Sequence, residues 1–145
     1  MARYLVVANQ TAGSTELREQ LLTLSREDPA ADFTILVPAT PPSSLLVWEE
    51  GEAKEIAYRR AEESQRSIEQ AGLKVRAARV GDHEPLQAIG DELEAQRGYR
   101  ALVISTLPPG VSRWLKMDLV SRARRSFPQL RIFHVVSEPE KPRTA

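Results

Sequence analysis

Short apolar runs alternate with longer amphipathic segments along this chain. Five runs have the length of β-strands and are bounded by turn-forming residues: Tyr4–Ala8, Phe33–Val37, Leu73–Val80, Ala101–Ile104 and Leu130–Val136. Short, nearly continuous apolar runs are typical of strands that are buried on both faces of a parallel sheet. The third run is the weakest of the five, because arginines interrupt it.

The segments between these runs carry helix signals. Capping residues and helix breakers bound four predicted helices: from Ser14 or Thr15 to before Pro29, from about Leu45 to Ala71, from Glu84 to before Gly98, and from Val111 to Ser126. The second helix follows a predicted loop over Pro41–Ser44. It keeps one stripe of small and apolar residues, and we interpret its charged remainder as a solvated face.

The resulting order, βαβαβαβαβ, predicts an α/β fold. We expect a Rossmann-like, three-layer sandwich with a five-stranded parallel sheet in the order 3-2-1-4-5 and right-handed crossovers. One domain should cover residues 1–137, and residues 138–145 should form a mobile tail. Ligands of such sheets bind beyond the carboxyl ends of the strands where the strand order reverses. That rule selects the loops Asn9–Ser14 and Ser105–Ser112.

Composition narrows the classes of function. The chain has 145 residues, 20 basic and 20 acidic side chains, two histidines and no cysteine. The balanced charge argues against a nucleic-acid binder, and the missing cysteines exclude disulfide scaffolds and thiolate metal sites. No apolar run approaches the length of a membrane span or of a signal peptide. We therefore expect a soluble, cytoplasmic protein that binds no metal, no nucleic acid and no membrane.

The two selected loops carry the candidate chemistry. The loop after the fourth strand enters a helix whose N-terminus, with Ser112 and Arg113, suits a phosphate. The alternative is a plain connection capped by Ser112, which Pro108 and Pro109 favour because neither has a backbone N–H. Polar residues of the first loop suit either a ribose or base contact or simple turn and capping hydrogen bonds.

Other candidate features have simpler interpretations. The basic helix is best interpreted as a solvated face, because aromatic residues for base stacking are scarce. Trp48 and Trp114 either line a pocket or pack under a long loop or at a dimer contact. Neither His83 nor His134 lies at an evident triad spacing, so no catalytic residue is predicted and an enzyme is not favoured.

These pieces together resemble the universal stress protein family. The resemblance spans about Arg3 to Val136 and rests on the opening strand with Asn9 and Thr11, the long charged helix, and the segment from Gly110 through Ser112 and Arg113. It implies an adenine nucleotide, such as ATP, as the cofactor to consider. The residues that it places at the nucleotide are Asn9, Thr11, Val37, Ser105, Gly110, Ser112 and Arg113.

The chain departs from the family pattern at that site. Asn9 stands where the family has aspartate, and Leu107 stands where the nucleotide loop has its first glycine. The closing glycine of the loop is also missing, and Leu107 adds a side chain where backbone would approach phosphate. We therefore predict weak or absent ATP binding and no other cofactor.

Three functions remain open at this point. The resemblance favours a regulatory or binding module that acts through an unidentified protein partner. The alternatives are a nucleotide-binding member that uses the two loops and a hydrolase that acts on an adenylate-like metabolite. A homodimer is predicted through the last strand, at Leu130, Ile132, Phe133, His134 and Val136, because an apolar edge strand invites pairing. The alternative is that the tail masks this edge.

Overall fold

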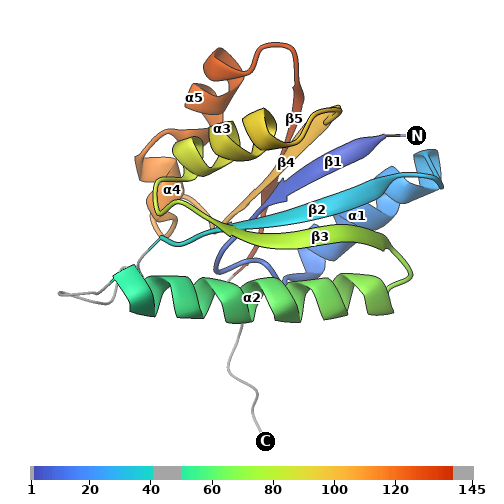
Figure 1. The fold of residues 1–145 in the computed structure, drawn as a ribbon, viewed down its shortest axis with the longest axis horizontal. Coiled ribbons are helices and arrows are strands. Elements are labelled where there is room, and N and C mark those ends of the chain that lie inside the picture. Colours follow the sequence, from blue (N-terminus) through green and yellow to red (C-terminus); the bar gives the residue numbers. More distant parts are fainter. Residues whose placement is uncertain (1, 41–49, 139–145) are drawn as a thin grey trace, which may run out of the picture.

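A five-stranded parallel sheet forms the centre of the computed structural model, which describes residues 2–40 and 50–138 (Figure 1). Its strands are β1 (Arg3–Val7), β2 (Asp32–Pro38), β3 (Lys74–Gly81), β4 (Ala101–Thr106) and β5 (Arg131–Val136). The order is β3-β2-β1-β4-β5, and every neighbouring pair is parallel. The predicted α/β class, strand number and strand order are therefore confirmed.

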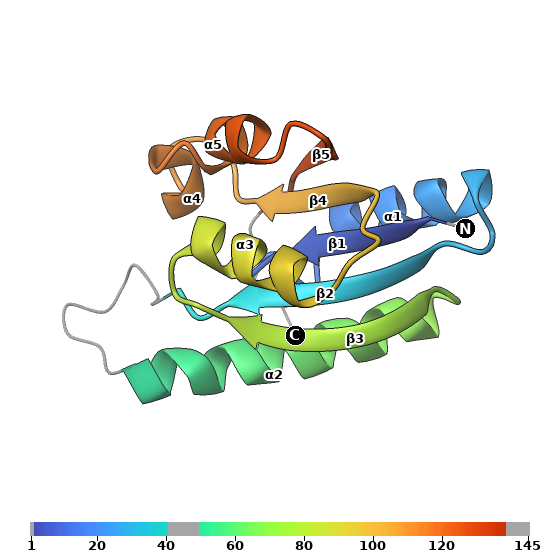
Figure 2. The ribbon, with the colours of Figure 1, turned by 45° about the horizontal axis from the view of Figure 1, so that its top comes forward.

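Helices cover both faces of the sheet (Figure 2). The helices are α1 (Thr15–Glu27), α2 (Glu50–Gln70), α3 (Pro85–Ala95), α4 (Arg113–Lys116) and α5 (Leu119–Ser126). Side chains of α1 and α2 belong to one apolar cluster, and side chains of α3, α4 and α5 belong to a second cluster across the sheet. Two layers of helix thus bury the alternating side chains of each strand, as βαβ crossovers require.

The sequence signals explain how the helices meet the sheet. The predicted stripe of α2 is buried at Ala53, Ala57, Ala61 and Ile68, and small residues let this long helix lie close to the sheet. On the opposite face, Gly81 allows a close approach of α3. A Cβ atom at Gly81 would lie 2.8 Å from the Cβ of Ala88, inside ordinary van der Waals contact.

The prediction of one continuous fourth helix from Val111 to Ser126 is wrong. The chain breaks it at Met117 and Asp118, so that α4 and α5 are separate helices. Asp118 has φ 56° in the left-handed region, where aspartate is tolerated better than most side chains. The sequence has no glycine or proline at this point, which is why the break carried no signal.

Several sequence expectations lie outside the described residues. The predicted loop Pro41–Ser44, the first turns of the helix predicted from Leu45, Trp48 and residues 139–145 of the predicted tail belong to that group. Glu138, the first residue of that tail, is described, and its backbone N–H donates to Glu16 Oε1 at 3.4 Å. Leu130 precedes β5 instead of opening it. None of the helices within residues 2–40 and 50–138 combines the length and apolarity that crossing a bilayer requires.

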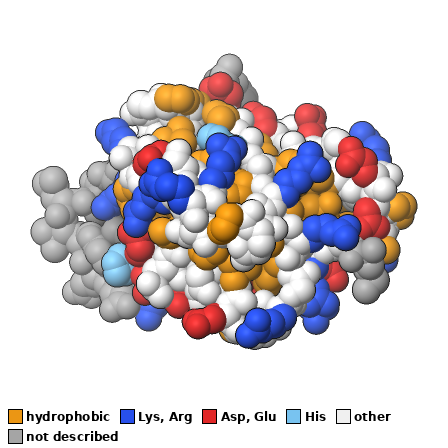
Figure 3. Space-filling view, turned by 90° about the horizontal axis from the view of Figure 1, so that it is seen from above, with side chains coloured by type: hydrophobic (Ala, Val, Ile, Leu, Met, Phe, Trp, Pro, Cys, Tyr) orange, Lys and Arg blue, Asp and Glu red, His pale blue; other side chains and the backbone are white. Residues whose placement is uncertain are grey.

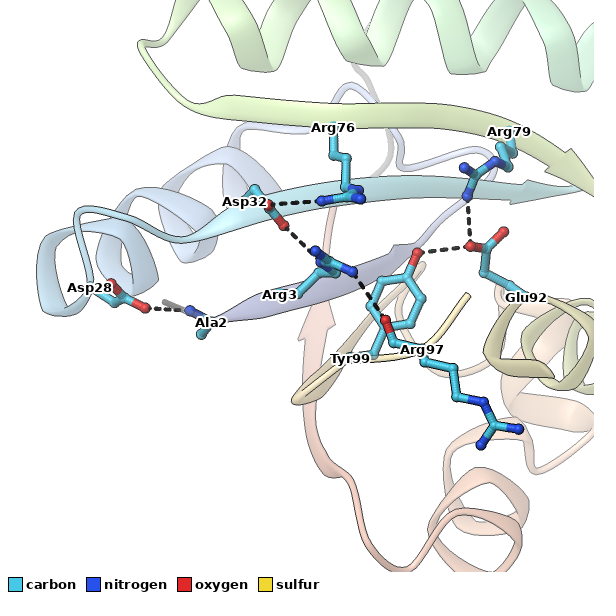
Figure 4. A network of polar contacts seen from close by, with 9 residues as sticks. All are labelled: Ala2, Arg3, Asp28, Asp32, Arg76, Arg79, Glu92, Arg97 and Tyr99. Carbon is cyan, nitrogen blue, oxygen red and sulfur yellow. Dashed lines mark hydrogen bonds and ion pairs between the residues drawn. The ribbon is translucent and has the colours of Figure 1, made fainter. Parts of the chain in front are cut away.

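A polar network lies on the sheet face that carries α3 (Figure 4). Glu92 is buried, and its Oε2 accepts from Arg79 Nη1 at 2.6 Å and from the Tyr99 hydroxyl at 2.8 Å. Burial raises the pKa of Tyr99, and the neighbouring Glu92 adds to the effect. Asp32 lies between Arg3 and Arg76, with N···O distances of 3.8 Å to each. These paired charges join β1, β2, β3 and α3, so their role is to hold the fold together.

Candidate functional site

A small hollow of about 50 Å³, open to solvent, lies beyond the carboxyl ends of β1 and β4. These two strands are the neighbours at which the strand order reverses, which is where open parallel sheets place their ligands. Its lining comes from four segments of the chain: Asn9, Gln10 and Thr11; Thr40; Arg60; and Ser105, Thr106, Leu107, Val111, Ser112, Arg113 and Trp114. The site is therefore built by both predicted loops together with the end of β2 and the middle of α2.

Asn9 ties three elements together at the mouth of the hollow. Its Nδ2 donates to the carbonyl oxygen of Pro38 at 2.8 Å, and its Oδ1 accepts from Nη1 of Arg60. Asn9 is 8% exposed, so both ends of its amide are used inside the protein. Burial lowers the pKa of the Arg60 guanidinium below its usual range.

Four buried hydroxyls form a chain behind the hollow. Thr11 Oγ1 and Ser105 Oγ are 2.6 Å apart, Ser105 Oγ and Ser137 Oγ are 3.4 Å apart, and Ser137 Oγ and Ser14 Oγ are 2.8 Å apart. Ser14 Oγ also accepts from the N–H of Leu17, which makes it the N-cap of α1 as predicted. These hydroxyls mainly bond to one another and join the ends of β1, β4 and β5.

The loop after β4 uses its backbone donors within itself. The N–H groups of Val111 and Ser112 both donate to the carbonyl oxygen of Pro108, at 3.1 and 3.0 Å. Pro108 and Pro109 have no N–H to offer. The Ser112 hydroxyl is 3% exposed and accepts from the N–H of Leu115 at 3.3 Å, so it caps α4. The plain-connection alternative of the sequence analysis describes this local geometry.

The structure brings five of the seven predicted site residues together. Asn9, Thr11, Ser105, Ser112 and Arg113 line the hollow. Val37 does not line it, because its side chain is fully buried in the cluster beneath α1 and α2. Gly110 does not line it either and lies exposed in the loop, with φ 88°.

Sequence reasoning missed several residues of this site, and Arg60 is the most informative. It was assigned to the solvated face of the long helix. Arg60 lies three residues after Ala57 and four residues before Ser64, so it flanks the buried stripe of α2 and points back to the sheet end. That spacing was the available signal. Thr40 was missed too, and its hydroxyl donates to the carbonyl oxygen of His83 at 3.0 Å.

Trp114 lines the hollow, which agrees with the pocket interpretation, and it packs in the core, which was not predicted. It is 7% exposed, packs in the cluster beneath α3 and α5, and also lines the hollow. Its indole Nε1 donates to the Thr40 hydroxyl at 3.4 Å. Trp114 therefore fixes the position of the loop wall instead of offering a free aromatic face.

The last strand lies where the homodimer prediction requires an edge. β5 pairs with β4 and ends the sheet. Ile132 and Phe133 are half-buried on opposite faces, whereas His134 is exposed and Val136 is 44% exposed. His134 Nε2 lies 2.8 Å from the Thr106 hydroxyl. Burial of the ring, and then the charge of Arg124, lowers the pKa of His134 below its usual value near 6.5.

Groups that hold metals are not gathered in the part of the chain that the structure describes. Within residues 2–40 and 50–138, no three histidine or carboxylate side chains are placed to bind one ion. The His83 ring lies 3.4 Å from Asp82 on an exposed turn, and His83 is not among the residues that line the hollow. The hollow is lined mainly by polar side chains, among them the half-buried guanidinium of Arg60.

The fold is similar to that of a solved protein. The crystal structure of a protein from the universal stress protein family from Burkholderia pseudomallei matches with a TM-score of 0.56 over 96% of both chains. The chain has the fold of a universal stress protein. Sequence identity is 12%, so the similarity extends to the fold alone. Neither a protein-family model nor a curated protein matches the sequence.

Proposed function

We propose that this chain is a universal-stress-protein-like regulatory and binding module that does not bind ATP robustly. The observation that carries the proposal is the loop after β4, in which the N–H groups of Val111 and Ser112 both donate to Pro108. Nucleotide phosphates bind to free backbone N–H groups of a loop and of the helix start that follows it. Here the loop N–H groups of Val111 and Ser112 are used, and two further loop positions are proline.

The first loop supports the same conclusion. An amide at position 9 would offer hydrogen bonds to a nucleotide, but Asn9 already donates to Pro38 and accepts from Arg60. A ligand that contacts Asn9 must first displace the guanidinium, which costs a charge-assisted hydrogen bond of about 1.5–3 kcal/mol. The site therefore favours its own internal contacts over an adenine nucleotide.

The test is whether the purified protein carries a nucleotide. Mass spectrometry of the supernatant after denaturation should detect no stoichiometric ATP, ADP or AMP. A control protein with an intact glycine-rich nucleotide loop, purified in parallel, shows that the procedure retains bound nucleotide. One nucleotide per chain would refute the proposal and support the alternative, a nucleotide-binding module that uses the loops after β1 and β4.

We also propose that the module is a homodimer through β5. The supporting observations are the position of β5 at the edge of the sheet and the exposure of Val136, its last residue. Two edge strands related by a two-fold axis would satisfy each other's unpaired backbone groups.

Light scattering tests this assembly. The native chain should have twice the mass of 16.2 kDa. Val136→Glu should give a monomer, because it places a charge at the contact without entering the core. Phe133→Glu is a poorer choice, since Phe133 packs against Tyr4 at a centroid distance of 6.4 Å. A monomeric native chain, or a dimer that Val136→Glu leaves intact, would refute an interface at β5.

A further inference from the structure

The balanced charge of the chain conceals a strong segregation. Residues 95–137 carry eight basic side chains and one acidic side chain, Asp118, for a net charge of +7. Residues 1–94 carry the compensating excess of acidic side chains. A segregation of this size produces a directional field even though the whole chain is neutral.

Six of these basic side chains come from elements on the α3 side of the sheet, which Figure 3 views from above. Lys and Arg side chains are spread across this face, and most Asp and Glu side chains lie nearer its outline. Six exposed or half-buried side chains form what we call the basic surface: Arg97, Arg113, Lys116, Arg122, Arg124 and Arg125. They come from α4, α5 and the segment that follows α3.

The short helix α5 is the centre of this basic surface. Its buried residues are Leu119, Val120 and Ala123. At about 100° of rotation per residue, Arg122, Arg124 and Arg125 occupy an arc of about 160° on the other side. Arginine therefore takes up most of the solvent-facing side of the helix.

Among the described residues, the arginines of this surface differ in whether a carboxylate lies close to them. Arg122 lies 3.9 Å from Glu84. Within residues 2–40 and 50–138, no carboxylate lies within ion-pair distance of Arg97, Arg124 or Arg125. The charge of Arg124 helps to lower the pKa of His134, after the burial of that ring. A surface of mutually repelling cations is relieved by an external anion.

We propose that the basic surface binds an acidic segment of a partner protein. The guanidinium fork matches a carboxylate with two parallel hydrogen bonds, and arginine is enriched where protein interfaces form. Val111, which is 56% exposed beside Arg113, offers an apolar contact to such a segment. The proposal rests on the proposed function, because it states which chemical class of partner the binding module would recognise.

The structure favours an acidic protein over a nucleic acid. The buried residues of α5 include no aromatic side chain, and none is exposed on it for base stacking. An acidic peptide segment needs no such stacking surface, because its carboxylates pair with the guanidinium groups directly.

Fluorescence anisotropy with the full chain tests this proposal. The probes are a labelled oligoglutamate, a labelled glutamate–leucine peptide and a labelled single-stranded RNA of the same net charge, all without nucleotide. We expect the two peptides to bind more tightly than the RNA, with an affinity that falls as salt rises. Arg124→Glu with Arg125→Glu should weaken peptide binding about tenfold or more, because two attractions become repulsions.

Two further variants make the result specific. Arg124→Gln with Arg125→Gln keeps the helix end free of unfavourable negative charge and should give a smaller loss of affinity. Arg59→Glu with Arg66→Glu makes the same change of charge on the exposed side of α2 and should leave affinity within about twofold, because these residues lie outside the basic surface.

Three results would overturn the proposal. They are tighter binding of the RNA, no binding of either peptide at low salt, or an equal loss in the α2 control. Each result is independent of the hollow, because none of these variants touches Asn9 or the loop after β4. Failure here would leave the argument about ATP intact, and bound ATP would leave the arginine result intact.

Discussion

The contact between Asn9 and Arg60 allows a quantitative prediction at the mouth of the hollow. The perturbations are Asn9→Ala, Arg60→Ala and the double variant. Asn9→Ala removes the neutral hydrogen bond to Pro38, worth about 0.5–1.5 kcal/mol, and the bond from the Arg60 guanidinium, worth about 1.5–3 kcal/mol. Arg60 is half-buried, so solvent screening places the second value near its lower end.

The three variants should differ in stability by amounts that these hydrogen-bond energies set. We expect Asn9→Ala to lower the free energy of unfolding by about 2.5 kcal/mol and Arg60→Ala to lower it by about 2 kcal/mol, the latter including lost packing of the arginine stem. The double variant loses the shared bond only once, so it should lose about 3 kcal/mol. The coupling energy between the two positions is then about 1.5 kcal/mol.

Urea unfolding measures this coupling. Stability should change through the midpoint concentration while the m-value stays constant, since the exposed surface on unfolding is unchanged. Additivity of the two single variants within about 0.5 kcal/mol would show that the side chains do not interact and would refute the reasoning. Arg60→Ala should not create ATP binding, because the N–H groups of Val111 and Ser112 remain bound to Pro108.

Two further predictions concern the sheet. Gly81→Ala should destabilise the fold by about 1–3 kcal/mol in urea unfolding, because its Cβ would lie 2.8 Å from Ala88 Cβ and 3.0 Å from Leu36 Cδ1. Gly51→Ala is the control, because no atom lies within 4 Å of the added Cβ, and it should be neutral or stabilising. His134 has a lowered pKa, so the unfolded state binds its proton first. The stability that the neutral His134 contributes is present above about pH 6.5 and is lost as the pH falls through the folded-state pKa. His134→Gln should therefore reduce the fall in melting temperature between pH 7 and pH 5 relative to the native chain. Equal falls in the two proteins would contradict this prediction.

The sheet could be predicted from the sequence because its strands obey local rules. β1 and β4 are buried along almost their whole length, so apolar runs and the turn residues after them were sufficient signals. The alternation of strands and helices then restricted the topology to a few orders. The break at Asp118 could not be predicted in this way, since it depends on how α4 and α5 pack and not on a helix-breaking residue.

The site could be predicted only in part. The rule of the reversed strand order selected both loops correctly, and Asn9, Thr11, Ser105, Ser112 and Arg113 line one hollow. Arg60 belongs to a helix far away in the sequence, and a charged residue beside a buried stripe is usually solvated. Val37 was selected from the family resemblance, which concerns backbone near the nucleotide and does not require its side chain to line the hollow.

The central claim is that the hollow does not bind ATP robustly, and isothermal titration calorimetry tests it most directly. The purified chain is titrated with ATP at millimolar concentration in the presence of magnesium, with dilution heats subtracted. We predict little heat beyond dilution, because the loop after β4 keeps its N–H groups for Pro108 and Asn9 keeps both ends of its amide occupied. A saturable isotherm with a micromolar or tighter dissociation constant and one site per chain would contradict the claim.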